Sequence, residues 1–199
     1  KPGETLPKEV KNLKYLESFS VASNDNNQIR EMQLGEDICE LAYLKHLTVQ
    51  AFGLVKLPAG FKKLGKSLES LNLVSNNFNK LSDITNIVNE KNFPKLRNLV
   101  LYAQRRTDVV INIASLGEMN ASGVYVYNNY PIGLYGKVNA GTADRQALLK
   151  LLTWDKLNTL ELSYCFLEGE LPTDEEMDEA LEAAGKPTRY TAADFSTNK

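Results

Sequence analysis

Few residues in this chain could carry out acid–base or nucleophilic chemistry. His46 is the only histidine, so a metal cluster built from histidines at ordinary spacing cannot be assembled. No serine–histidine–acid or cysteine–histidine arrangement suggests itself around His46, and no glycine-rich phosphate loop is present. We therefore expect neither a metal nor a cofactor.

Two carboxylates are enough for glycoside hydrolysis, so acidic pairs have to be considered as well. Only Glu17, Glu69 and Glu161 are expected to project from the strands described below. The strand spacing puts Glu17 and Glu69 about 10 Å apart, and Glu161 lies farther along the sheet. This is a poor catalytic pair, and we predict that the chain is not an enzyme.

Composition narrows the classes of partner. The chain has 199 residues, is 43% hydrophobic and carries a net charge of −2, from 23 basic and 25 acidic residues. This hydrophobic content is enough for a folded core. The balanced charge gives no reason to expect nucleic acid or an anionic membrane as a partner. No apolar run approaches the roughly 18 residues that suggest a membrane span.

A repeated pattern dominates the sequence. Leucine or another apolar residue recurs as L-x-x-L-x-L-x-x-N/C in six segments, 16–24, 44–52, 68–76, 96–104, 121–129 and 157–165. The alternating x-L-x-L-x centre of each segment predicts a short strand. One such unit cannot cover its own apolar residues, whereas a stack of units closes a continuous core. The predicted core residues are Phe19, Val21, Leu47, Val49, Leu71, Leu73, Leu99, Leu101, Val124, Val126, Leu160 and Leu162.

These six segments resemble the leucine-rich-repeat family, whose repeats span about 20–29 residues. The resemblance implies an α/β fold: a right-handed, curved solenoid with a parallel β-sheet on the concave face. The outer face is expected to mix helix and irregular chain. The sixth segment follows the fifth at a longer interval, so we predict an insertion within 130–156. Residues 1–172 then form a domain of about six repeats.

The stretches between the repeated segments, and the two ends of the chain, carry signals of their own. Segments 36–43, 82–92 and 142–153 are predicted helices, with Ser82 and Thr142 as N-caps. Residues 173–199 should form a C-terminal cap helix, over 174–184, and a loosely held tail. An acidic interaction segment is the alternative for that helix. The sequence starts within the repeat pattern, which favours either a short cap before the first strand or a preceding part of a longer protein.

The last position of each segment predicts a polar ladder. Asn24, Asn76 and Asn129 should turn inward and hydrogen-bond the backbone, with Cys165 in the same place. Phe52 and Gln104 depart from the pattern, so the ladder should be broken there or replaced by packing. Cys39 and Cys165 should both be free thiols, because about four strand spacings separate them.

In the family, ligands commonly bind the concave sheet. Tyrosines gather on the predicted concave positions of the last three repeats, and tyrosine is favoured in interfaces because it joins an apolar face to a hydrogen-bonding tip. The alternatives are that the rings are covered by 130–156, or only reflect strand propensity. The predicted ligand-binding residues are Tyr102, Tyr125, Tyr127, Tyr164, Val100, Asn128 and Glu161.

The leading hypothesis is a non-catalytic binding scaffold for a protein or peptide. The alternatives are a glycan-binding module, with tyrosines as stacking platforms, and a structural spacer in a longer surface protein. Leu167-Glu-Gly169-Glu-Leu171-Pro172 is similar to the repeat endings of plant-type members, whereas the cysteine-rich caps of animal and plant extracellular members are absent. We therefore expect a bacterial protein, exported to the cell envelope or secreted, and monomeric.

Overall fold

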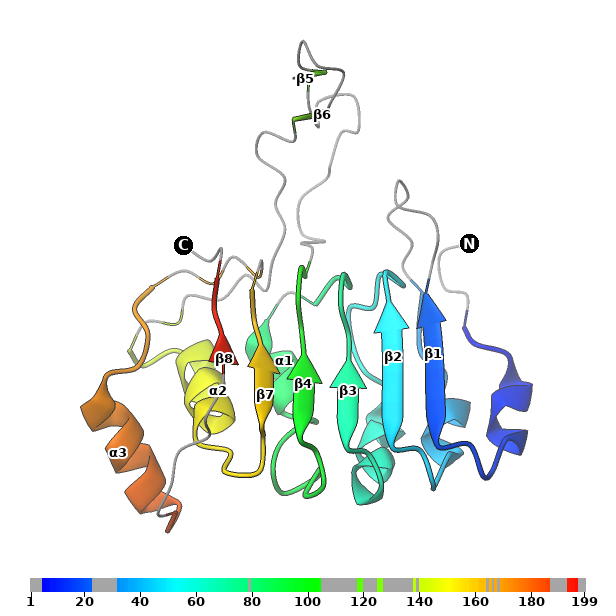
Figure 1. Ribbon diagram of the computed structural model, residues 1–199, viewed down its shortest axis with the longest axis horizontal. Helices are drawn as coiled ribbons and strands as arrows, with labels where there is room; N and C mark the ends of the chain where they lie inside the picture. Colours follow the sequence, from blue (N-terminus) through cyan, green and yellow to red (C-terminus); the bar gives the residue numbers. More distant parts are fainter. Residues whose placement is uncertain are drawn as a thin grey trace.

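The computed structural model describes residues 5–22, 32–78, 80–104, 118–119, 125–126, 138, 140–163, 165, 167, 169–186 and 193–196. An all-parallel, six-stranded sheet runs along the molecule in the order β1-β2-β3-β4-β7-β8 (Figure 1). Its strands are β1 (Ser18–Ala22), β2 (His46–Gln50), β3 (Ser70–Asn72), β4 (Asn98–Val100), β7 (Thr159–Glu161) and β8 (Ala193–Asp194). The fold is therefore α/β and solenoid-like.

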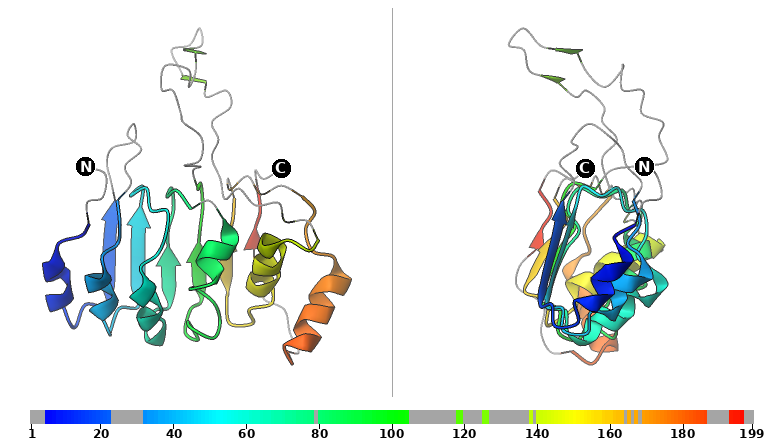
Figure 2. Two further views of the ribbon diagram at one scale, coloured as in Figure 1. Left: turned by 180° about the vertical axis from the view of Figure 1, so that it is seen from behind. Right: turned by 90° about the vertical axis from the view of Figure 1, so that its right-hand side faces the viewer.

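The described helices all lie on one face of this sheet, as the side view in Figure 2 shows. They are the 3-10 helices η1 (Lys8–Asn12), η2 (Glu36–Glu40) and η3 (Ala59–Lys66) and the α-helices α1 (Leu81–Thr85), α2 (Ala143–Leu152) and α3 (Asp174–Ala183). The expected mixture of helix and irregular chain on this face is confirmed in the described part of the chain.

Strand register places the repeated apolar residues in rows. Phe19 pairs with Leu47, and this row continues through Leu71, Leu99 and Leu160. Of the ten predicted core residues whose side chains are described, eight are buried in one continuous core. Phe19 and Val21 pack against that core but are only half-buried, because β1 is the first strand of the sheet.

The turn that follows a strand has the same backbone shape in three repeats. Ala51, Ser75 and Ala103 have φ values of 56°, 57° and 56°, in the left-handed region that non-glycine residues rarely adopt. Each of their N–H groups donates to a carbonyl of the next repeat, at 2.9–3.2 Å. The repeat in the sequence is therefore a repeat in backbone conformation as well.

Asn76 forms the inward ladder that the sequence predicts. Its side-chain oxygen accepts hydrogen bonds from the N–H groups of Phe52 and Leu54, both at 3.2 Å. Its amide nitrogen donates to the carbonyls of Val49 and Leu73, at 2.8 and 2.9 Å. One buried side chain thus joins the turns of two repeats. Asn24 and Asn129 lie outside the described residues.

The ladder continues where the sequence predicted a break. Gln104 donates from Nε2 to the carbonyls of Leu73 and Leu101, at 2.8 and 3.0 Å, so the predicted break is wrong for the donor half of the ladder. Its buried Oε1 accepts no hydrogen bond in the described structure, so the acceptor half is broken there. Cys165 follows, with its Sγ donating to the Leu101 carbonyl at 3.0 Å. At Phe52 the side chain is buried and packing does replace the polar group, as expected.

The described part of the fifth sequence segment, Tyr125–Val126, is not a strand of the parallel sheet. β4 pairs directly with β7, with Leu99 opposite Leu160, which leaves no place for a strand between them. Tyr125–Val126 instead forms β6, which pairs antiparallel with β5 (Glu118–Met119) in a separate two-stranded sheet. The predicted sixth repeat strand is therefore the fifth of the main sheet. The sheet is completed by β8, from a segment that was predicted to be a loose tail.

The helix predictions are confirmed in part. Thr142 caps α2, accepting a hydrogen bond from the Arg145 N–H at 3.1 Å. This helix lies within 130–156, where an insertion was expected, and packs against α1. For α1 the cap was wrong, because the helix begins at Leu81 with Lys80 as N-cap and ends at Thr85. The prediction of a C-terminal cap helix is confirmed as α3, where Thr173 and Glu176 form a capping box.

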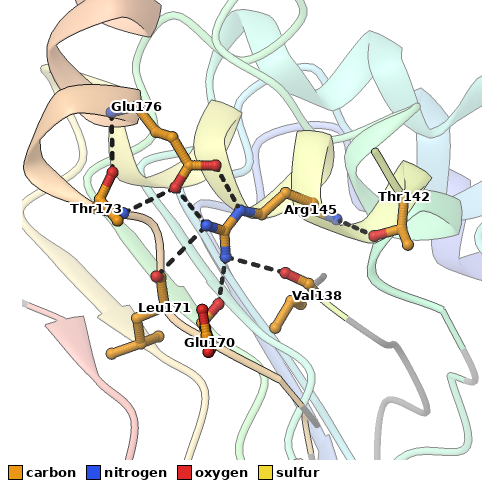
Figure 3. Close-up of polar contacts among 7 residues, drawn as sticks. All are labelled: Val138, Thr142, Arg145, Glu170, Leu171, Thr173 and Glu176. Atoms are coloured by element: carbon orange, nitrogen blue, oxygen red, sulfur yellow. Dashed lines mark hydrogen bonds and ion pairs between the residues drawn. The ribbon is translucent and has the colours of Figure 1, made fainter. Parts of the chain in front are cut away.

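Arg145 joins α2 to α3 and to the segment before it (Figure 3). Its guanidinium forms an ion pair with Glu176 and donates to the carbonyl groups of Val138, at 2.9 Å, Glu170, and Leu171, at 3.4 Å. The Arg145 side chain is only 5% exposed. All the acceptors belong to chain segments around the C-terminal end of the sheet, so one cation holds this end together.

Both cysteines are free, as the sequence predicts, and the structure shows that both are buried. Burial raises the pKa of the Cys39 thiol to about 12, and that of the Cys165 thiol to about 12. A thiol needs its thiolate form to react, so neither sulfur is a nucleophile at neutral pH. Their roles in the described structure are packing and, for Cys165, a backbone hydrogen bond.

Candidate ligand-binding face

One face of the parallel sheet carries none of the described helices (Figure 2). Because strand side chains alternate, the residues between the buried ones point to this open face. Register aligns them in two rows, and every member is half-buried or exposed. The first row is Ser20, Thr48, Asn72, Val100, Glu161 and Asp194, and the second is Ser18, His46, Ser70, Asn98 and Thr159.

Two of the predicted binding residues lie together on the open face. Val100 is directly opposite Glu161, because β4 pairs with β7. Both side chains are half-buried, and so is that of Tyr102, which follows β4. These three residues bring an aliphatic group, a carboxylate and a phenol to the C-terminal half of the face. His46, expected to be exposed, is exposed in the other half.

The other predicted residues do not complete the patch in the described structure. Tyr125 belongs to β6, outside the parallel sheet, so the prediction that it lies in the strand between β4 and β7 was wrong. Tyr127, Asn128 and Tyr164 lie outside the described residues. The tyrosines were expected on three adjoining strands, of which segment 121–129 would supply the middle one. Because β4 pairs directly with β7, that middle strand is not there.

The structure adds Asp194, which the sequence analysis missed. β8 places Asp194 opposite Glu161, so two carboxylates lie side by side at the C-terminal end of the open face. Glu161 accepts a hydrogen bond from the Ser163 hydroxyl at 3.1 Å, and Asp194 accepts one from the Ser196 N–H at 2.8 Å. A two-residue strand carries no periodic signal, so no pattern in the sequence could have identified this neighbour.

The face therefore changes in character along its length. The end formed by β1, β2 and β3 presents small neutral groups, among them Ser20, Thr48 and Asn72. The end formed by β4, β7 and β8 presents an apolar group beside an acidic pair. Such an arrangement suits a ligand that brings a cation and an apolar group to the acidic end, because opposite charges across an interface select partner and orientation.

The described residues offer neither a metal centre nor a membrane span. No group of three or more His, Cys, Asp or Glu side chains in them is placed to hold a metal ion. None of their helices has the length and apolar character needed to cross a membrane. Comparison with protein-family models, with curated proteins and with solved structures finds no match to this chain.

Proposed function

We propose that this chain is a leucine-rich-repeat protein and a non-catalytic scaffold that binds a protein or peptide on the open face of its sheet. The proposal is supported by three regularities of the described repeats. Each contributes one parallel strand, the turn after the strand has one recurrent left-handed residue, and inward polar side chains join neighbouring turns. These are properties of a stack built from one repeated unit.

The observation that carries the binding proposal is the uncovered face itself. Parallel sheets are usually covered on both faces, because each face otherwise leaves apolar surface in water. Here the described helices cover one face only, and the other is lined by side chains such as Asn72 and Thr48 that can remain partly hydrated. A sheet that is stable with one face open supplies a wide, rigid surface for a second molecule.

The acidic end indicates the chemistry of the ligand. Val100 and Glu161 lie opposite one another, with Asp194 beside Glu161, and Tyr102 follows on β4. A peptide with a lysine or arginine next to an aliphatic or aromatic residue would satisfy both parts of this end. Phenol and carboxylate groups are common anchors for such side chains at interfaces.

The test is selection from a random peptide library displayed on phage. The wild-type chain is expected to enrich peptides in which a basic residue neighbours an apolar one. The double substitution Val100→Arg with Glu161→Lys should abolish capture of those peptides. The matched control, Lys150→Glu, reverses an exposed charge on α2, on the helix-covered side of the sheet, and should leave capture intact.

Folding of the variants is checked by circular dichroism and thermal unfolding. Lys150 is exposed and Val100 and Glu161 are half-buried, so all three positions should tolerate the changes. If the selected peptides bind the double variant as well as wild type, the open face is not their site and the proposal fails. The proposal also fails if the library yields no enriched peptide from the wild-type chain.

A further inference from the structure

Two tyrosine rings stand exposed beside one another at the N-terminal edge of the molecule, away from the open face. Tyr15 is 83% exposed and Tyr43 is 55% exposed. Their ring centroids are 5.7 Å apart and their planes are tilted by 35°. They lie in the turns that lead into β1 and β2. These two turns are neighbours at the lower edge of the sheet in Figure 1.

The fold does not require aromatic residues at these two positions. Tyr15 and Tyr43 each precede a leucine whose N–H donates to the carbonyl three residues earlier, at 2.9 and 3.1 Å. The same turn recurs before Leu96 and Leu157, and there the preceding residues are Lys95 and Lys156. Lysine thus serves equally well in this turn. Because the positions are turns, the preference of tyrosine for strands does not explain the rings either.

The backbone that carries the two rings is held in place before any ligand arrives. The two turns belong to adjacent strands, since Ser18 is paired with His46, and the Lys45 and His46 N–H groups both donate to the Glu17 carbonyl, at 2.8 and 3.0 Å. A tyrosine side chain has few rotatable bonds, so fixing it on a rigid turn costs little entropy on binding. Exposed clusters of large side chains commonly mark interaction sites.

Most of the other residues that line the groove around the rings are polar. The two tyrosines line a groove of about 500 Å³ with Lys11, Asn12, Lys14, Glu40 and Ala42. Asn12 offers an amide donor and acceptor, and Lys14 an ammonium donor. The Glu40 carboxylate is paired with Lys63 at 2.6 Å, and the Lys11 ammonium with Asp37 at 2.9 Å. The charges of the rim are thus largely compensated.

We propose that this groove is a binding site for the sugar rings of a neutral glycan. The C–H groups on one face of a pyranose carry partial positive charge and pack on the electron-rich face of an aromatic ring. Its hydroxyl groups need donors and acceptors at the edge of that ring, which Asn12, Lys14 and Glu40 supply. Two adjoining rings, 5.7 Å apart, can support two successive sugars of one chain.

The same features disfavour a peptide in this groove. Peptide side chains bind best in well-packed, desolvated pockets, whereas Tyr15 and Tyr43 form an open platform. The ion pairs of Lys11 and Glu40 leave Lys14 as the one rim charge that no described ion pair compensates, so the groove carries little charge to attract an acidic or a basic peptide. A flat polyhydroxylated ring, apolar on its face and polar at its edge, matches both the platform and the rim. This site goes beyond the proposed peptide-binding function and does not depend on it.

The test is binding of neutral oligosaccharides of defined linkage, such as glucose, xylose, mannose and N-acetylglucosamine oligomers, measured first on a glycan array and then by calorimetry. The wild-type chain should bind at least one of them, with a Kd near or below about 1 mM. Tyr15→Ala with Tyr43→Ala should weaken that binding at least about tenfold, which is about 1.4 kcal/mol. Tyr15→Phe with Tyr43→Phe should keep most of it, because stacking needs the ring and not the hydroxyl.

Two controls separate this proposal from loss of fold and from the open face. Lys95→Ala, in the equivalent turn of the fourth repeat, should leave glycan binding unchanged, as should the open-face variant Val100→Arg with Glu161→Lys. The proposal is overturned if no neutral glycan binds the wild-type chain, if binding survives the double alanine substitution, or if it is lost only in the open-face variant. It is also overturned if the rings are needed only for capture of displayed peptides.

Discussion

The first and last strands of the repeat stack differ in how well they bury equivalent residues. On β1, Phe19 and Val21 are half-exposed, although their partners Leu47 and Val49 on β2 are buried. At the other end, Leu160 and Leu162 are buried, with β8 pairing along β7. The difference shows that an apolar residue of this fold is buried by the repeat stacked on each side, and not by its own unit alone.

The C-terminal end is closed by polar side chains as well as by packing. Arg145 draws α3 and the segment before it onto α2. Beyond α3, Lys186 forms an ion pair with Glu90 and donates to the Thr153 carbonyl at 2.7 Å. In the described residues of the first repeat, an equivalent buried cation is not found; the Lys11–Asp37 pair there is largely exposed.

The largest expected effect is the loss of Arg145. Arg145→Ala leaves Glu176 and three carbonyl groups without their donor. Breaking a buried ion pair costs about 3–5 kcal/mol, and because the Glu176 side chain is 31% exposed we expect the low end, about 3 kcal/mol. The free energy of unfolding, measured by urea denaturation, should fall by that amount. Lys150→Ala, at an exposed position of the same helix, should change it by less than about 0.5 kcal/mol. A loss below about 1 kcal/mol for Arg145→Ala would mean that the C-terminal end is held by apolar packing alone.

The next effect compares one residue type at two places in the same row. Val49 is fully buried on β2, and its neighbour Val21 is half-exposed on β1. Val49→Ala should reduce the free energy of unfolding by about 2 kcal/mol, and Val21→Ala by about 1 kcal/mol or less, because less apolar surface returns to water. Equal losses would show that another part of the chain covers β1.

The sequence predicted the interior of this stack better than its ends. Alternation of large apolar residues correctly indicated the buried rows on β2, β3, β4 and β7, because each of these side chains packs against the equivalent residue of the next repeat. It failed at 121–129, where Ala121 replaces the first large leucine of the pattern. The segment at 157–165 has leucine at all three positions and follows α2, whose buried Leu148 and Leu151 cover the back of the sheet.

The candidate site was predicted only where it rests on that regular interior. Val100 and Glu161 were correctly placed on the open face, but Asp194 came from a strand too short to show alternation. Gln104 shows a different limit. Its side chain is one methylene longer than asparagine and still reaches the same kind of carbonyl acceptor, so matching by residue name missed a role that depends on reach.

Acid is expected to loosen the C-terminal end before the N-terminal end. The Thr173 backbone N–H, and then Arg145, lower the pKa of Glu176. A carboxyl group with a lowered folded-state pKa stabilises the fold above its unfolded pKa, and that contribution is lost as pH falls through the folded pKa. Lys11 behaves in the opposite sense, because its hydrogen bond to Asp37 raises its pKa, so the stabilisation linked to the Lys11 charge is lost as pH rises through that pKa.

Hydrogen exchange measures this difference directly. As pH falls below about 4, the protection of α3 amides, corrected for intrinsic rates, should decrease more than that of η1 and η2. In Glu176→Gln, protection of α3 should be lower at neutral pH and should change less with acidification. If α3 is equally sensitive to acid in the variant and in wild type, titration of Glu176 is not the cause.

The smallest effect concerns the turns, where strain is local and should not depend on distance from either end. A non-glycine residue in the left-handed region costs roughly 1–2 kcal/mol, and glycine gives back about 0.5–1 kcal/mol of this through its greater freedom in the unfolded chain. Ala51→Gly and Ala103→Gly, at φ 56°, should therefore each stabilise the protein by about 0.5 kcal/mol, observed as a higher Tm. Ala42 is the control: it lies at an exposed turn position and its φ is not positive, so Ala42→Gly should give no gain in stability. A clearly smaller gain for Ala51→Gly, nearer β1, than for Ala103→Gly would contradict this. It would show that the edge of the sheet at β1 affects the backbone of the neighbouring turn as well as side-chain burial.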